Sequence, residues 1–249
     1  MEPAPESPDR RPAFYALAPG GWRDWWTLLH PPYTAWMLSY VAFGAVTAPR
    51  LDGAWLGLTV AGFFLGVGIT AHALDELVGR PLGTGIGDGT LWAVALAALA
   101  GAIALGVYGA AIVSPWIAVF IVFGAFIVLA YNLELFHGAF HSDLWFALAW
   151  GAFPAITGAF AQTGTIRWQA CVVAAACAAL SSAQRTLSTP VRRLRRSVAT
   201  VEGRLVLSDG TVEPLDASAL RDAPEGALRA LSLGIPALAA GLVFARLVH

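Results

Sequence analysis

The sequence predicts an all-α protein that crosses a membrane several times, a polytopic helical bundle. Hydrophobic residues make up 57% of the 249 residues and charged residues only 12%, whereas soluble domains carry about 25% charged residues. Stretches without Asp, Glu or Arg recur at lengths that suit a bilayer crossing, which takes about 20 mostly apolar residues. The formal net charge of −1 creates no field that would attract a nucleic acid. These observations exclude an ordinary soluble globule, a disordered chain and a nucleic-acid binder.

About seven membrane helices follow from these charge-free stretches. The longest stretch, 89–133, is too long for one crossing, and the Gly, Ser and Pro residues between Tyr108 and Pro115 divide it in two. The polar residues before the first helix contain no small-residue cleavage site, so we expect no signal peptide. The predicted helices lie near residues 33–49, 53–76, 90–108, 115–135, 144–163, 167–184 and 229–247.

The charged residues divide the chain into four parts. These are a cytoplasmic N-terminal segment, 1–24, a membrane bundle, 25–184, a cytoplasmic insert, 185–228, and a last membrane helix, 229–249. The insert begins with a basic stretch, 192–196, and then alternates around Asp209-Gly210 in the pattern of a short hairpin. With the N-terminus inside, twelve arginines fall on the cytoplasmic side and three outside. We therefore expect an integral protein of a bacterial or archaeal plasma membrane with a cytoplasmic N-terminus.

Ionisable residues gather at the ends of the second and fourth predicted helices, both on the cytoplasmic side. Ionisable groups in a membrane bundle are unfavourable unless they have a role, which makes these residues functional candidates. His72, Asp75 and Glu76 are three and four residues apart, and so are Glu134, His137 and His141, so each set shares one face of a helix. Polar residues close to the two sets are Arg80, Tyr131, Asn132 and Asp143.

Histidine and carboxylate residues at these spacings are typical of metal sites in helical bundles. We expect the following side chains to converge on a divalent metal: His72, Asp75, Glu76, Glu134, His137, His141 and Asp143. The candidate catalytic residues are Asp75, Glu76 and His137, and the candidate substrate-binding residues are Arg80, Tyr131 and Asn132. Imidazole with carboxylate favours Zn, Fe or Mn over Mg. The alternative is a set of interfacial polar residues that bond to loop backbone and water.

At these residues the chain resembles the UbiA superfamily of intramembrane prenyltransferases, helical bundles with acidic motifs at the cytoplasmic ends of the second and fourth helices. The first family motif is Asn-x-x-x-Asp-x-x-x-Asp followed by an Arg-Pro-Leu-like stretch. Asp75 and Arg80-Pro81-Leu82 match it, whereas Ala71 and Gly79 replace the other two motif residues. The second region is similar to residues 131–143 and the apolar helix after them. The resemblance covers about residues 22–184.

The resemblance implies an enzyme that acts on an isoprenoid diphosphate or related lipid, as a transferase or cyclase, with Mg²⁺ bridging carboxylates and diphosphate. One alternative is a His/carboxylate metalloenzyme on the same fold, an oxidoreductase or hydrolase that uses Zn, Fe or Mn. The other is a non-enzymatic lipid-binding protein. In each case the partners are the membrane and a lipid or isoprenoid, with no nucleic acid, and the oligomeric state is open.

Overall fold

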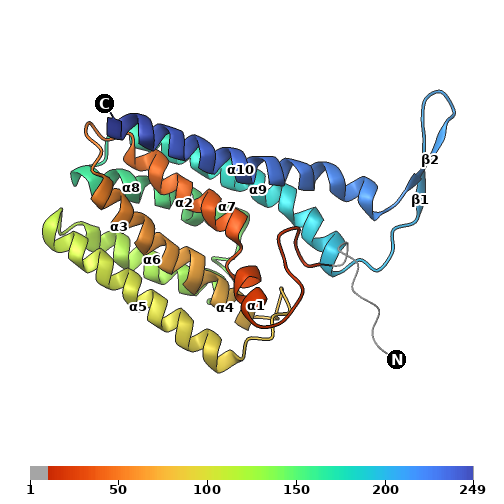
Figure 1. The fold of residues 1–249 in the computed structure, drawn as a ribbon, viewed down its shortest axis with the longest axis horizontal. Helices are drawn as coiled ribbons and strands as arrows, with labels where there is room; N and C mark the ends of the chain where they lie inside the picture. The colour runs from red at the N-terminus through yellow and green to blue at the C-terminus, as the bar shows by residue number, and fades with distance from the viewer. Residues whose placement is uncertain (1–10, 249) are drawn as a thin grey trace.

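The computed structural model describes residues 11–248, which are mostly helical (Figure 1). Within these residues, seven helical rods run back and forth along the long axis of the molecule, after a short first helix, α1 (Trp22–Leu28). The rods are α2 (Pro31–Ala45), α3–η2–α4 (Gly53–Phe63, Phe64–Ala71, His72–Leu77), α5 (Asp88–Ile112), α6 (Ile117–Asn132), α7–η3–α8 (Asp143–Ala147, Leu148–Ala152, Phe153–Thr163), α9 (Trp168–Arg196) and α10 (Ala217–Val248). The segments η2 and η3 are π-helical turns inside otherwise α-helical rods.

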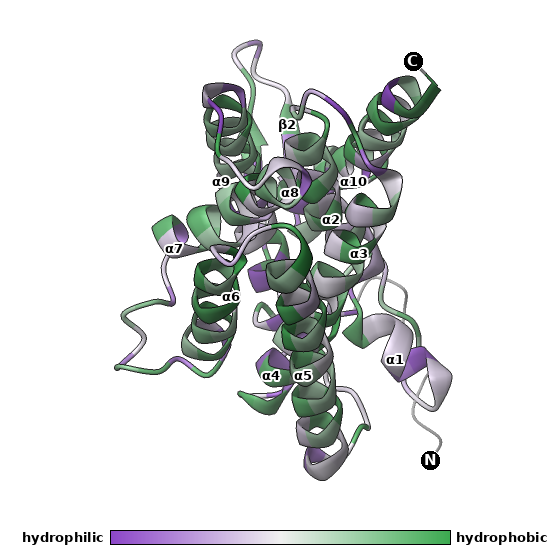
Figure 2. Cartoon of the chain, turned by 90° about the vertical axis from the view of Figure 1, so that its left-hand side faces the viewer, coloured by the Kyte–Doolittle hydropathy of each residue, from purple (hydrophilic) through white to green (hydrophobic). Residues whose placement is uncertain are grey.

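Five of the described rods are long and apolar enough to cross a bilayer: 53–77, 88–112, 143–163, 168–196 and 217–248. Hydrophobic residues surround α5, α6, α9 and α10 on the outside of the bundle as well as the inside (Figure 2). Large apolar side chains such as Trp92, Val122 and Leu233 are exposed along these helices. A soluble protein rarely exposes apolar surface on this scale, whereas lipid tails cover it in a bilayer. The prediction of an all-α integral membrane bundle is therefore confirmed at this level.

Helices α2 and α8 approach each other closely because both present glycine at their contact. A Cβ atom on Gly44 would lie 1.8 Å from the carbonyl oxygen of Ala155, and one on Gly158 would lie 2.1 Å from that of Val41. Small residues let helix backbones approach in this way, which increases van der Waals contact inside a membrane. This contact forms the centre of the bundle, against which Trp36 packs fully buried.

The last two helices are longer than the charge-free stretches predict. The helix predicted to end at 184 continues to Arg196, and the helix predicted to begin at 229 begins at Ala217. Absence of charge marks the part of a helix that lies in lipid, but a helix continues into water wherever its polar residues still pack. The segment between the helices is therefore 197–216, shorter than the predicted insert. It contains the predicted hairpin, with β1 (Gly203–Val206) antiparallel to β2 (Val212–Leu215).

One end of the bundle, which we call the head end, collects the polar connections. Here α4, α6 and α9 finish and α2, α7 and α10 begin (Figure 1). The N-terminal residues 11–17, which we call the strap, lie across this end. Arg195 and Arg196 donate hydrogen bonds to the backbone oxygens of Arg11 and Pro12, at 3.2 Å each. The strap is thereby held against the end of α9.

Candidate functional site

A cavity of about 380 Å³ lies at the head end, and we call it the head cavity. The strap, α2, the second rod, the end of α6, the loop after it, the rod that begins with α7, and α9 all contribute to its wall. Its wall is unusually polar for the inside of a membrane bundle. The polar lining residues are Tyr15, His30, Tyr33, His72, Asp75, Tyr131, Asn132, His141, Gln184, Arg185, Ser188, Arg192, Arg193, Arg196 and Ser197.

Five of the predicted site residues line this cavity: His72, Asp75, Tyr131, Asn132 and His141. They come from both predicted clusters, which the fold brings to one cavity because α4 and α6 end side by side. The ring of Tyr131 stacks on that of His141 with centroids 4.4 Å apart. His72 places its Nδ1 3.0 Å from the carbonyl oxygen of Gly68, the distance of a hydrogen bond.

The side chains of Glu76 and Arg80 bond to the loop that follows α4 and do not reach the head cavity. The buried carboxylate of Glu76 accepts hydrogen bonds from the backbone N–H groups of Leu82 and Thr84, at 3.0 and 2.8 Å. Arg80 pairs with Asp88 and donates to the carbonyl oxygen of Ile86. Neither residue lines the head cavity, since both side chains organise the loop.

Glu134, His137 and Asp143 also lie outside the cavity wall. The predicted helical spacing of Glu134 and His137 is absent because α6 ends at Asn132, and both residues have positive φ values, 49° and 59°. The loop folds back instead, and its aromatic side chains pack on Phe126 of α6. Asp143 pairs with Arg185 at the edge of the cavity.

The arginines of α9 are the most strongly charged of the site residues that the sequence analysis missed, which also include His30 and Gln184. Arg185, Arg192, Arg193 and Arg196 line the head cavity. The steps from 185 to 192 and from 192 to 196 are seven and four residues, a helical repeat that places these side chains on one face. The repeat was visible in the sequence, but the predicted end of the membrane helix at 184 assigned these residues to the cytoplasmic insert and not to the site.

The charge of the cavity wall is strongly positive. Four guanidinium groups face one carboxylate, Asp75, so the formal excess is three positive charges when the histidines are neutral. Burial lowers the pKa of His30 well below its ordinary value, and His72 and the nearby arginines lower that pKa further, so His30 is neutral at pH 7. Its ring stacks on that of His72 with centroids 4.3 Å apart.

The cavity also contains polar atoms that lack a partner. Gln184 is only 4% exposed, and its Oε1 atom is buried without a hydrogen bond to any residue of the described chain. The same is true of the Nε2 atom of His30. Buried polar groups nearly always have a partner, so a bound polar ligand or water would complete this wall.

The donor set of the head cavity does not fit the predicted metal sites. Within residues 11–248, no group of three or more His, Cys, Asp or Glu side chains is arranged to hold a metal ion. Asp75 is the one carboxylate among the lining residues, whereas Mg²⁺ prefers several oxygen ligands. Zn²⁺ takes three or four protein ligands, but the lining histidines stack on other rings, His30 on His72 and His141 on Tyr131, and do not group with Asp75 around one point. The positive charge of the wall comes from guanidinium groups instead.

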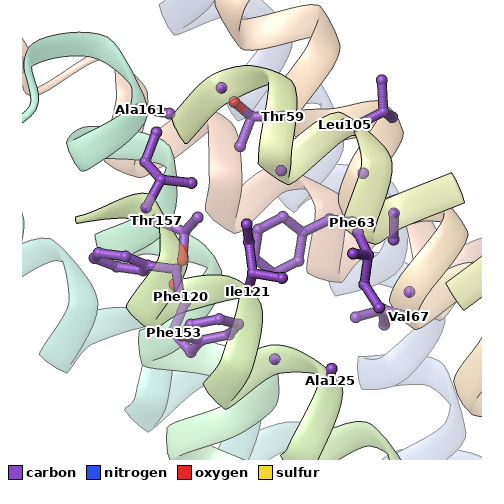
Figure 3. A pocket seen from close by; sticks show the side chains of 18 of the residues that line it. Thr59, Phe63, Val67, Leu105, Phe120, Ile121, Ala125, Phe153, Thr157 and Ala161 are labelled. Atoms are coloured by element: carbon purple, nitrogen blue, oxygen red, sulfur yellow. The ribbon is translucent and has the colours of Figure 1, made fainter. Parts of the chain in front are cut away.

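A second pocket, of about 160 Å³, is a mostly apolar groove between α3 with η2, α5, α6 and α8. Phe63, Phe120 and Phe153 gather around it (Figure 3). Gly62 also lines it, and a Cβ atom on this residue would meet nothing within 4 Å. Trp150 of η3 lines both the groove and the head cavity, so the two adjoin each other at this side chain.

Comparison of the chain with protein-family models, with curated proteins and with solved structures gives no match.

Proposed function

We propose that the chain is an integral membrane enzyme of UbiA-like type that binds an isoprenoid diphosphate, or a related anionic lipid, and acts on it as a transferase or cyclase. The observation that carries the proposal is the junction at Trp150, where a positively charged cavity adjoins an apolar groove. An amphiphile with an anionic headgroup has the same two parts. Binding pockets are typically apolar with a few placed polar groups, and this pair of pockets fits that description.

The chemistry of the cavity wall supports binding of an anionic headgroup in the head cavity. Arginine binds phosphate groups through two parallel hydrogen bonds, which makes a cluster of arginines well suited to phosphate or diphosphate. The buried Oε1 atom of Gln184 is an acceptor, so it would contact a hydroxyl group or a water beside the headgroup rather than a phosphate oxygen. Asp75, in the position of the first acidic motif, is the candidate catalytic residue that remains in the cavity.

The shape and the apolar lining of the groove support binding of the ligand's hydrocarbon chain there. Its aromatic walls would exclude water from a carbocation that forms when the diphosphate leaves, and aromatic faces attract cations. The groove reaches from Trp150 to Trp55, which lies near the start of the second rod at the opposite end of the bundle. An isoprenoid chain would therefore run along the bundle with its headgroup in the head cavity.

The proposal includes seven membrane spans, with α2 and α6 crossing beside the five longer rods. It also assigns the head end to the cytoplasm. Arg50, Arg167 and Arg246 lie at the opposite end, whereas the other described arginines lie in or near the head end or in the hairpin. Short connections that carry an excess of arginine face the cytoplasm in most membrane proteins.

Farnesyl diphosphate binding and turnover by the purified chain in lipid nanodiscs test the proposal. We expect binding, and release of diphosphate when a prenyl acceptor is supplied or a cyclic product forms. Gly62→Leu fills the groove and is expected to weaken binding at least about tenfold, because a buried chain loses several methylene contacts. Gly57→Leu is the matched control, since Gly57 is also on α3 with open space around it but does not line the groove.

Three outcomes would contradict the proposal. Absence of farnesyl diphosphate binding would refute it. Binding without turnover under all acceptors would favour a lipid-binding protein. Stoichiometric Zn, Fe or Mn in the purified protein, together with no diphosphate binding, would favour the His/carboxylate metalloenzyme.

A further inference from the structure

The head cavity carries more positive charge than its own residues neutralise. Arg185 is paired with Asp143 and donates a hydrogen bond to the hydroxyl of Tyr131. Within residues 11–248, no ion pair joins Arg192, Arg193 or Arg196 to a carboxylate. Three guanidinium groups on adjacent turns of one helix repel one another, and a bound anion relieves this repulsion.

The carboxylates that a metal would need are directed elsewhere. Glu76 is fully buried against the loop that follows α4, and Asp143 lies outside the wall as the partner of Arg185. Asp75 is therefore the one carboxylate that lines the head cavity together with the arginines. A site that places one carboxylate beside four guanidinium groups is organised to receive negative charge directly, because a divalent cation would be repelled by most of the groups that line it.

We infer that the head cavity binds the phosphate groups of its ligand through the arginines of α9, without a divalent metal ion. This inference rests on the proposed function, because it names how the same site holds its anionic headgroup. A phosphomonoester carries a charge of about −1.5 to −2 at pH 7, and a diphosphate carries more. With Arg185 paired to Asp143, the other three guanidinium groups and Asp75 leave a formal excess of two positive charges, which matches such a group without help from Mg²⁺.

The inference predicts opposite effects on the affinity for the anionic ligand for two substitutions that each remove one charge. Arg192→Gln removes a positive group that would bond the headgroup, and it should weaken binding at least about tenfold. Asp75→Asn removes the one negative charge of the wall, and it should leave binding of the anion unchanged or tighten it. If a metal ion bridged Asp75 and the diphosphate, Asp75→Asn would weaken binding instead.

The experiment measures equilibrium binding of farnesyl diphosphate to the full chain in nanodiscs of neutral phosphatidylcholine, with EDTA and with excess Mg²⁺. We expect affinities within about threefold of each other in the two conditions, with the signs given above for both variants. Arg204→Gln, in the exposed hairpin, is the matched control and should bind as the parent does. Arg192→Lys keeps the charge but loses the paired hydrogen bonds, so an intermediate affinity is expected even if the Gln variant folds poorly.

Inorganic pyrophosphate in the presence of EDTA distinguishes the lipid headgroup from free phosphate. Weaker binding of pyrophosphate than of farnesyl diphosphate supports both the inference and the groove. Equal binding supports the arginine site and contradicts the groove of the proposed function. Binding of farnesyl diphosphate only with Mg²⁺ overturns the inference and leaves the proposed function standing, whereas absence of binding in both conditions overturns both.

Discussion

Glu76 accepts two hydrogen bonds from Thr84, one from its backbone N–H at 2.8 Å and one from its hydroxyl at 2.9 Å. The neighbouring carboxylate, Asp75, lines the head cavity instead. Two adjacent acidic residues of the same helix therefore differ in role, because adjacent side chains point to different faces of a helix. Glu76 holds the loop that closes this end of the bundle, and Asp75 faces the proposed ligand.

Glu76→Gln should lower the stability of the protein, whereas Asp75→Asn should not. In the Gln variant, an amide N–H₂ group replaces one carboxylate oxygen and faces the backbone N–H groups of Leu82 and Thr84, which are donors too. Each lost hydrogen bond to a charged group reduces stability by about 1.5–3 kcal/mol. Thermal unfolding in detergent measures the difference, and hydrogen exchange at the backbone N–H groups of Leu82 and Thr84 reports opening of the loop. Equal loss of stability in both variants would show that the two carboxylates do not differ in this way.

Gly158→Ala should destabilise the bundle, because its Cβ atom would overlap the carbonyl oxygen of Val41. Overpacking of a tight contact typically reduces stability by about 1–3 kcal/mol, and a contact with backbone is harder to relieve than one with a side chain. Gly57→Ala is the control, since nothing lies within 4 Å of its Cβ position, and alanine there favours the helix by up to about 1 kcal/mol. Relative to the parent protein, the unfolding midpoint should fall for Gly158→Ala and stay the same or rise for Gly57→Ala. A Gly158→Ala variant as stable as the parent would contradict the packing argument.

Glu225→Gln should separate the ends of α9 and α10. Arg195 and Glu225 form an ion pair at 2.7 Å with side chains only 4% and 5% exposed. The buried carboxylate of Glu225 also pairs with Arg221 and Arg229, so replacing it removes the negative charge on which three guanidinium groups converge. Loss of a buried charged partner reduces stability by about 3–5 kcal/mol. Asp222→Asn, on the same helix but exposed, should change stability by less than about 1 kcal/mol. Similar unfolding curves for the two variants would show that the buried ion pair does not contribute to stability.

Thiol labelling of intact cells checks the membrane orientation. Cys171 and Cys177 are first replaced by alanine, and single cysteines are then introduced as Ser208→Cys in the hairpin turn and Thr165→Cys in the connection between α8 and α9. An impermeant maleimide should label the second variant and spare the first, because the head end is assigned to the cytoplasm. The reverse pattern would invert the topology and move the head cavity to the outer face.

The sequence by itself determined the bundle and the approximate position of each helix. Lipid requires long runs of apolar residues, so the absence of charge over 53–76 or 144–163 is enough to locate the helices at Gly53–Leu77 and Asp143–Thr163. The turn signal at Asp209-Gly210 likewise located the hairpin. These features depend on neighbouring residues along the chain and on the solvent, which a sequence records directly.

Only the tertiary structure decided which polar residues meet. Glu134 and His137 lost their expected helical spacing because α6 stops at Asn132, and Glu76 was directed to a loop that the sequence places six to eight residues away. Arg192 and Arg196 entered the cavity because α9 continues past the apolar stretch and packs against α10 there. The direction of a side chain at the end of a helix depends on where that helix ends and on what packs beside it, and both are set by contacts between distant segments of the chain.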